Sequence, residues 1–185
     1  PIQRLADSGP HFQGMHAPHS MVNPASAYTD PGRFARELKV LFRNGPTLLG
    51  LSCEMPNPGD YLSTTLDSVP VFAVRQPDGT IRAMVNACRH RGNAFCEGSG
   101  HSARFTCPYH NWSYGLDGQC LSVAKPDYDG PVEEFVGDKA ELGLIEVPAE
   151  EFAGFIFMSP DGAARPLAEF LGPAGPLLAA YRLDD

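Results

Sequence analysis

Short runs of apolar residues, interrupted by Gly, Pro, Asn or Asp, predict that most of this chain folds as a series of β-strands. A Gln-Pro-Asp-Gly turn at 76–79 lies between two such runs and predicts a hairpin. The last two runs are predicted to pair with each other. The predicted strands cover residues 47–51, 60–66, 69–75, 80–86, 103–106, 119–123, 142–147 and 152–159.

One segment before the first strand has helical periodicity. The Asp-Pro pair at 30–31 supplies the residue types preferred at an N-cap and at the first helical position. An Asn-Gly-Pro sequence at 44–46 then ends the helix. The apolar positions between these signals fall on one helical face, and they are Phe34, Leu38, Leu41 and Phe42.

These elements divide the chain into four predicted parts. The stretch before the helix is polar and rich in turns, and the stretch after the last strand is prone to form short helices. The parts are an irregular segment over 1–29, a helix over 30–46, a β domain over 47–160 with a small lobe over about 86–123, and a C-terminal helical or linker segment over 161–185.

Composition indicates a globular protein that works away from membranes and nucleic acids. With 185 residues, 43% of them hydrophobic and 19% charged, the chain is long enough to bury a core. A net charge of −8 argues against nonspecific nucleic-acid binding. The apolar runs are too short to cross a bilayer, and the N-terminus lacks the pattern of a secretory signal. We therefore expect no membrane partner and a cytoplasmic location.

Two short loops carry the clearest candidate chemistry. Residues 88–90 read Cys-Arg-His and residues 107–110 read Cys-Pro-Tyr-His, so each loop offers one thiolate and one imidazole. A structural zinc site more commonly takes paired Cys-x₂₋₄-Cys and His-x₃₋₅-His halves. The mixed order favours a Rieske [2Fe–2S] cluster, which has two cysteines on one iron and two histidines on the other. The candidate ligands are Cys88, His90, Cys107 and His110.

Two other uses of these residues stay open. They could form a Cys₂His₂ zinc site that staples an interaction module, or a catalytic Cys–His arrangement. The remaining cysteines are odd in number and do not indicate a disulfide framework. They are Cys53, Cys96 and Cys120.

A second histidine pair has a spacing that imitates a non-haem iron site. His11 and His16 are five residues apart with Asp7 upstream, and such a site takes two histidines and one carboxylate. However, Pro10 and Gly14 oppose the helix that would place these side chains together. We therefore expect no metal role for this pair.

The residues around the two loops have two possible interpretations each. The aromatic residues Trp112 and Tyr114 either shield the centre from water or simply pack beside it. The arginines near the loops either present a positive rim to an acidic electron donor or bond locally. These arginines are Arg82, Arg89, Arg91 and Arg104.

The sequence around both loops closely resembles the Rieske domain of the ring-hydroxylating oxygenase α subunits. The usual form in that family is Cys-x-His-Arg-Gly followed by Cys-Pro-Tyr-His-Gly-Trp, and residues 88–92 and 107–112 follow it with one departure. Asn111 occupies the position where the family usually has Gly. The stretches 28–31 and 56–61 also look like the lead-in of those subunits, so the resemblance runs from about residue 28 to residue 160 or beyond.

The resemblance implies a fold and a cofactor. The fold is the mainly β Rieske iron–sulfur fold, with antiparallel sheets, a two-loop cluster-binding subdomain and an additional N-terminal helix. The cofactor is a [2Fe–2S] cluster, with Cys88 and Cys107 on the buried iron and His90 and His110 on the outer iron.

The resemblance also implies partners. Electrons would arrive from an NAD(P)H-dependent reductase, in some members through a ferredoxin, and would leave through His110. In the family they reach a mononuclear Fe(II) in the catalytic domain of a neighbouring subunit of a trimer, where O₂ is activated to hydroxylate an aromatic or related substrate. Nothing in this chain supplies that domain, so we expect no catalytic residue here. A free-standing Rieske ferredoxin is the alternative, although the long lead-in before Cys88 argues against it.

Overall fold

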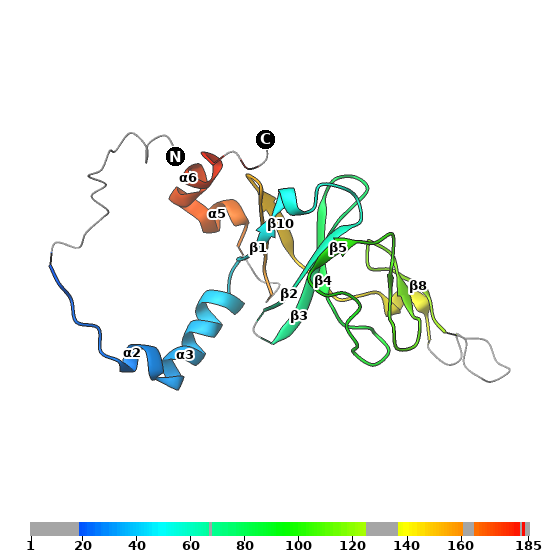
Figure 1. Ribbon diagram of the computed structural model, residues 1–185, viewed down its shortest axis with the longest axis horizontal. Coiled ribbons are helices and arrows are strands. Elements are labelled where there is room, and N and C mark those ends of the chain that lie inside the picture. The colour runs from blue at the N-terminus through cyan, green and yellow to red at the C-terminus, as the bar shows by residue number, and fades with distance from the viewer. Residues whose placement is uncertain (1–18, 67, 125–136, 161–164, 182, 184–185) are drawn as a thin grey trace.

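The computed structural model describes residues 19–66, 68–124, 137–160, 165–181 and 183. Helices lie at one end of the molecule, two antiparallel sheets lie in the middle, and a small third sheet lies at the other end (Figure 1). The central sheet has the order β5 (Ser99–His101), β2 (Asp60–Leu66), β3 (Val69–Arg75), β4 (Ile81–Val85) and β9 (Glu146–Val147). This arrangement confirms the mainly β prediction.

Two three-stranded sheets flank the central one. The outer sheet has the order β1 (Thr47–Leu51), β11 (Phe155–Met158) and β10 (Ala149–Phe152). The small sheet, which supports the two loops, has the order β6 (Phe105–Thr106), β7 (Ser113–Tyr114) and β8 (Cys120–Ser122). We call residues 86–123, which contain the small sheet, the two loops and strand β5 at the edge of the central sheet, the lobe.

Strand β3 is buried on both faces and separates two cores. Val71 and Ala73 pack in a cluster with Ile156 of the outer sheet. Phe72 and Val74 point to the opposite face, because side chains alternate along a strand, and they pack in a cluster with residues of the lobe such as Phe105. The central sheet is therefore packed between the outer sheet and the lobe.

Arg75 binds three backbone carbonyls and one carboxylate at the end of β3. Its side chain is almost fully buried and donates to the carbonyl oxygens of Met55 at 2.9 Å, Gly79 at 2.8 Å and Ser52 at 3.4 Å. The same guanidinium pairs with the Glu151 carboxylate of β10 at 2.7 Å. Arg75 therefore ties the central sheet to the outer sheet and to the turn that precedes β2.

The predicted pairing of the last two strands is wrong. Strand β9 pairs with β4, whereas β11 pairs with β10 in a hairpin and with β1 on its other side. The hairpin turn consists of Ala153 and Gly154, which both have positive φ angles, 50° and 80°. Positive φ at both central positions is typical of a type I′ turn, which reverses the chain within two residues. The apolar run over 152–159 therefore contains a turn at its start.

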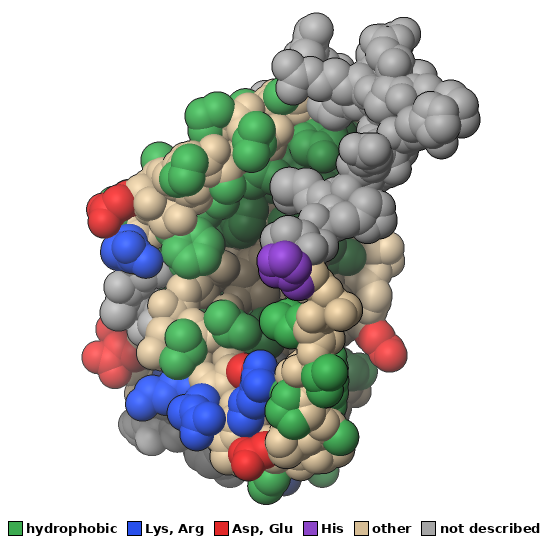
Figure 2. Space-filling view, turned by 90° about the vertical axis from the view of Figure 1, so that its left-hand side faces the viewer, with side chains coloured by type: hydrophobic (Ala, Val, Ile, Leu, Met, Phe, Trp, Pro, Cys, Tyr) green, Lys and Arg blue, Asp and Glu red, His purple; other side chains and the backbone are tan. Residues whose placement is uncertain are grey.

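The N-terminal helix forms where it is predicted, but its apolar face is not buried. Helix α3 (Pro31–Glu37) begins after Asp30, whose side chain accepts from the backbone N–H of Arg33 at 2.6 Å, and it continues as a π-helix over Leu38–Arg43. Phe34, Leu41 and Phe42 are 62%, 60% and 46% exposed. In the described part of the chain, no residue of this helix is buried, and Figure 2 shows hydrophobic side chains on this side of the molecule.

Short helices occupy the two ends of the described chain. A four-residue helix, α2 (Ser26–Thr29), precedes α3, so the part of residues 1–29 that the structure describes is not wholly irregular. At the other end, α5 (Leu167–Leu171) and α6 (Gly175–Ala179) follow the sheets, and Leu167 and Leu171 pack on Phe157 of the outer sheet. Among the residues described, no helix has the length and apolar character needed to span a bilayer.

Candidate metal centre

The first loop leaves the central sheet after β4 and folds back on itself through backbone hydrogen bonds. The Cys88 N–H donates to the carbonyl of Asn93 at 2.8 Å, and the Gly92 N–H donates to the carbonyl of Cys88 at 2.8 Å. Gly92 has a φ of 74°, a left-handed conformation that costs glycine little. The turn that the Arg-Gly pair at 91–92 predicts is therefore present.

The second loop, between β6 and β7, repeats the same backbone pattern. The Cys107 N–H donates to the carbonyl of Trp112, five residues on, at 2.8 Å. The Asn111 N–H, four residues on, donates to the Cys107 carbonyl at 2.9 Å. Asn111 has a φ of 57°, so each loop has a left-handed residue four positions after its cysteine. The two loops are equivalent turns that differ in where the histidine stands.

The conformation of Asn111 accounts for the one departure from the family pattern. Asn adopts left-handed backbone more readily than most residues, whereas an ordinary side chain costs about 1–2 kcal/mol there. We expect Asn111→Gly to keep the free energy of unfolding within a few tenths of a kcal/mol and Asn111→Ala to lower it by about 1 kcal/mol. Urea unfolding of the two variants measures this difference, and equal stabilities would contradict the left-handed turn.

The buried side-chain amide of Asn86 hydrogen-bonds to the backbone at the end of the first loop, and the sequence analysis did not identify it. The Asn86 side chain donates to the Cys96 carbonyl at 2.7 Å and accepts from the Phe95 N–H at 2.9 Å. Asn86 is buried, so both bonds replace water that the amide cannot reach. The signal in the sequence is a polar residue that ends an apolar strand two positions before a candidate ligand.

The four candidate ligands lie together as two pairs. Cys88 and Cys107 are buried in one cluster at the centre of the lobe. His90 and His110 are half-buried, and their Nδ1 atoms are 3.1 Å apart. The structure thus brings the predicted residues together, with the thiols on the inner side and the imidazoles nearer the surface. Their role as metal ligands stays a prediction.

The geometry of the pairs fits a centre with two metal ions better than one with a single ion. Two imidazole nitrogens 3.1 Å apart can both lie at about 2.1 Å from one ion, a usual metal–imidazole distance. Within the described ranges, no group of three or more His, Cys, Asp or Glu side chains is arranged to hold one ion. A Cys₂His₂ zinc site needs four ligands around one ion, whereas a two-iron cluster needs two ligands at each end.

The hydroxyl of Tyr114 lies within hydrogen-bonding distance of one of the two thiols, that of Cys88. Its oxygen accepts a hydrogen bond from the Arg89 N–H at 3.1 Å and lies 3.4 Å from Cys88 Sγ. Because the backbone group can only donate, the hydroxyl hydrogen is available for the sulfur. Burial, together with the bond to Cys88, raises the pKa of Tyr114 well above its ordinary value and keeps the hydroxyl protonated.

The two histidines have unlike aromatic neighbours. The His90 ring stacks on Trp112 with centroids 5.0 Å apart and planes 9° apart, and Trp112 is 5% exposed. The His110 ring leans on Tyr109 with centroids 3.8 Å apart and planes 36° apart, and Tyr109 is 60% exposed. Burial lowers the pKa of His90, and so do the positive charges of His110 and Arg91 nearby. The lowered pKa favours the neutral imidazole.

The other candidate residues lie outside this arrangement. Arg82 makes a two-point pair with Glu146 at 2.9 Å, which favours the local interpretation for this arginine, while Arg89, Arg91 and Arg104 are exposed. The two N-terminal histidines and Asp7 lie outside the described residues. Cys53, Cys96 and Cys120 are free thiols, and burial raises the pKa of Cys96 to about 12.

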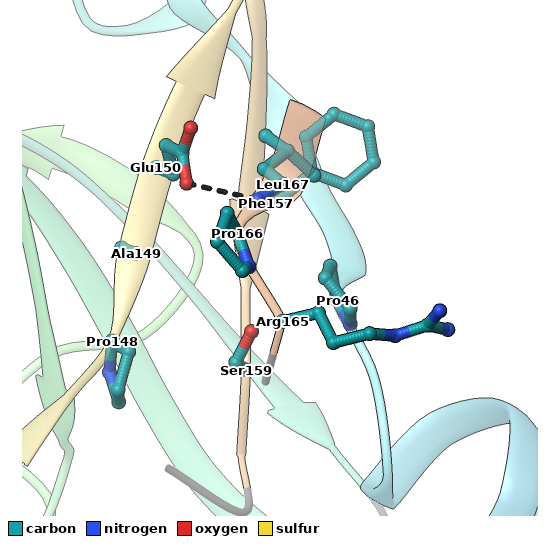
Figure 3. Close-up of a pocket in the computed structure, with 9 residues that line it drawn as sticks. All are labelled: Pro46, Pro148, Ala149, Glu150, Phe157, Ser159, Arg165, Pro166 and Leu167. Carbon is teal, nitrogen blue, oxygen red and sulfur yellow. Dashed lines mark hydrogen bonds between the residues drawn. The ribbon is translucent and has the colours of Figure 1, made fainter. Parts of the chain in front are cut away.

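A cavity of about 210 Å³ lies away from the loops, between the outer sheet and α5 (Figure 3). The Glu150 carboxylate accepts from the Leu167 N–H at 3.3 Å at the start of α5. None of the residues that line the cavity comes from the lobe, and most of them are apolar. They are Pro46, Pro148, Ala149, Glu150, Phe157, Ser159, Arg165, Pro166 and Leu167. We interpret the cavity as a packing gap where the C-terminal helices meet the outer sheet.

Comparisons with known proteins point to one family. A family model described as the Rieske [2Fe-2S] domain matches residues 46–135. The chain is 36% identical over 168 residues to the oxygenase subunit of glycine betaine monooxygenase from Chromohalobacter salexigens, covering 90% of this chain and 36% of that protein. It is also 36% identical over 151 residues to the biphenyl 2,3-dioxygenase subunit alpha from Rhodococcus jostii, covering 80% of this chain and 31% of that protein.

Solved structures give the same result. A crystal structure of the quaternary ammonium Rieske monooxygenase CntA is similar with a TM-score of 0.73 and 27% identity, over 84% of this chain and 44% of that one. A structure of naphthalene 1,2-dioxygenase is similar with a TM-score of 0.65 and 38% identity, over 76% of this chain and 31% of that one. The chain thus spans about a third of the length of the curated relatives described above.

Proposed function

We propose that this chain, which belongs to the Rieske oxygenase family and contains its [2Fe–2S] domain, delivers single electrons to the catalytic iron of an oxygenase α subunit. One observation supports this function most directly. Two equivalent backbone turns present a buried pair of thiols and, nearer the surface, a pair of imidazoles with Nδ1 atoms 3.1 Å apart. A cluster with unlike ends needs this division of ligands.

Different side chains of the lobe would bind the two ends of the cluster. When bound, the cluster supplies one-electron transfer. Cys88 and Cys107 hold its buried end, and Tyr114 donates a hydrogen bond to the Cys88 sulfur. His90 and His110 hold the outer end, where the rings are only half-buried. We assign the electron exit to His110, because its aromatic neighbour Tyr109 is exposed and available to a partner.

The partners in this proposal are an electron donor and a catalytic iron. The donor is a reductase or a ferredoxin, and the exposed arginines Arg89, Arg91 and Arg104 suit an acidic surface on it. The catalytic Fe(II) would lie in the catalytic domain of a neighbouring subunit of a trimer. The names of the relatives include both a glycine betaine monooxygenase and a biphenyl dioxygenase, so we propose the electron transfer that serves both and not one substrate.

The test is the EPR spectrum of the anaerobically purified chain after reduction with dithionite. We expect two irons and two acid-labile sulfides per chain, with a rhombic signal whose average g lies below that of all-cysteine [2Fe–2S] clusters. Mixed ligation causes this difference, because imidazole and thiolate make the two irons unlike. A silent sample that contains zinc and no sulfide would overturn the proposal.

A pair of cysteine variants tests the ligand assignment. Cys88→Ala is expected to lose the cluster, because a thiolate ligand disappears. Cys120→Ala is the matched control. Cys120 packs against the same group of buried side chains as Cys88, but it lies on strand β8 and in neither loop. It is expected to retain iron and sulfide at the level of the unsubstituted chain. Equal retention in both variants would contradict the assignment of Cys88.

A further inference from the structure

Among the residues that the structure describes, the His90 ring has no hydrogen-bond partner other than His110. A histidine that binds metal usually donates its second ring nitrogen to a carboxylate or a carbonyl, which fixes the orientation of the ring. In the described part of the chain, the only hydrogen-bonding contact of His90 is the 3.1 Å contact between its Nδ1 and that of His110. The Nε2 atom has no such protein partner there. Something else must hold the ring.

The intrinsic torsion preference of histidine does not supply that support. Rotation about the bond between Cβ and the ring is broad and roughly two-fold, so the surroundings choose the orientation. The surroundings of His90 are the indole of Trp112, which lies parallel to it within 9° and is itself buried. The indole is fixed by the core of the lobe, where it packs in one cluster with Cys88, Cys107 and Tyr114.

We propose that Trp112 is a positioning residue for His90: its buried indole holds the imidazole in the plane that turns Nδ1 toward His110. This inference rests on the proposed ligand pair. The support is one-sided, because the ring beside His110 belongs to the exposed Tyr109. Stacking on Trp112 therefore makes the two half-buried histidines unequal, because the ring beside His90 is buried and the ring beside His110 is exposed.

The stack also has an electrostatic consequence with a definite sign. The face of an indole carries partial negative charge and attracts positive charge on a neighbouring ring. Oxidation of the centre draws electron density from its imidazole ligands, so the indole favours the oxidised form. Removal of the indole face is expected to raise the reduction potential, provided that the replacement still excludes water.

Three variants of the 185-residue chain test the proposal. Trp112→Leu keeps an apolar side chain but removes the ring, and Trp112→Phe keeps a smaller ring. Phe95→Leu is the control, because the Phe95 ring contacts Phe72 of β3 and Tyr114 of the lobe, and its ring contacts in the described structure include no histidine. Pulsed EPR of each reduced variant gives the couplings of the two ligand nitrogens, and a redox titration gives the potential.

The expected result is a change in one nitrogen coupling and a higher potential in Trp112→Leu. Trp112→Phe should shift the same coupling in the same direction by less, and Phe95→Leu should leave both couplings unchanged. Unchanged couplings in both Trp112 variants, or equal changes at both nitrogens, would overturn the role of Trp112. So would a change in Phe95→Leu that matches the one in Trp112→Leu.

Two further outcomes separate this inference from the proposed function. If Trp112→Leu does not fold, Trp112→Phe decides alone, and couplings identical to those of the unsubstituted chain would overturn the positioning role. If the unsubstituted chain shows no ligand-nitrogen couplings, then the proposed cluster ligation fails, and the role of Trp112 fails with it. Two couplings in the unsubstituted chain with no effect of Trp112 refute the positioning role only.

Discussion

Replacement of Arg75 by Met is expected to lower the free energy of unfolding by roughly 3–5 kcal/mol. The buried guanidinium donates to the carbonyls of Met55, Gly79 and Ser52 and pairs with Glu151 at 2.7 Å. Met fills a similar volume but donates no hydrogen bond, so these carbonyls and one carboxylate lose their partner. Urea unfolding of the chain followed by circular dichroism measures the loss.

A second arginine on the next strand provides the control. Arg82 makes a two-point pair with Glu146, but both side chains are well exposed. Exposed pairs contribute little, so Arg82→Met is expected to cost at most about 1 kcal/mol. If the two variants lose the same stability, then the burial of Arg75 is not what gives it importance.

The effect of Arg75 should also depend on pH in a defined direction. Burial, the largest single influence, would raise the pKa of Glu151, but the hydrogen bond and charge of Arg75, together with Ser52, outweigh it and lower the pKa from its ordinary value of 4.5. A lowered pKa in the folded state means that the pair stabilises the protein above pH 4.5 and that this part is lost as the carboxylate is protonated. The difference between the chain and Arg75→Met should therefore shrink in acid.

Replacement of Tyr114 by Phe is expected to lower the reduction potential of the proposed cluster by roughly 40–60 mV. The Tyr114 hydroxyl lies 3.4 Å from Cys88 Sγ and can donate its hydrogen there. A donor on the sulfur stabilises the electron-rich reduced form, and about 1 kcal/mol of such preference corresponds to roughly 40 mV for one electron. A redox titration of the two proteins, followed by optical absorption or circular dichroism, measures the change.

Tyr61 supplies the matched control for this variant. Its ring packs edge-on against Phe105 in the core beneath the lobe, in a cluster that includes neither Cys88 nor Cys107. Tyr61→Phe removes the same atom at a distance from the sulfur and is expected to leave the potential unchanged. A potential that stays the same in Tyr114→Phe, or that rises, would show that the hydroxyl does not donate to the sulfur.

Much of the strand framework could be predicted because its signals are local. The ranges predicted for the first three strands, 47–51, 60–66 and 69–75, agree with β1, β2 and β3. The start of the helix follows from the capping chemistry of Asp30, which is also a local property. The two-residue turn at 153–154 escaped because Ala gives little sign of a positive φ, and the strand pairing was mistaken as a result.

The candidate site shows the same limit more sharply. Residue types and spacing identified all four candidate ligands, and the structure brings them together. The equivalence of the two loops could not be predicted, because the loops differ in sequence. The same backbone hydrogen bonds and the same left-handed position occur with Gly92 in one loop and with Asn111 in the other. The partners of Asn86, Trp112 and Tyr114 were also hidden, since each contact joins residues that are far apart in the chain or on different loops.

Strand β3 gives the protein a property that neither core has alone. Successive side chains of this strand enter opposite cores, with Val71 and Ala73 on one side and Phe72 and Val74 on the other. Melting of either core removes one wall of the other, because both share this backbone. We therefore expect the lobe to unfold together with the two larger sheets in one cooperative transition, without a melting temperature of its own.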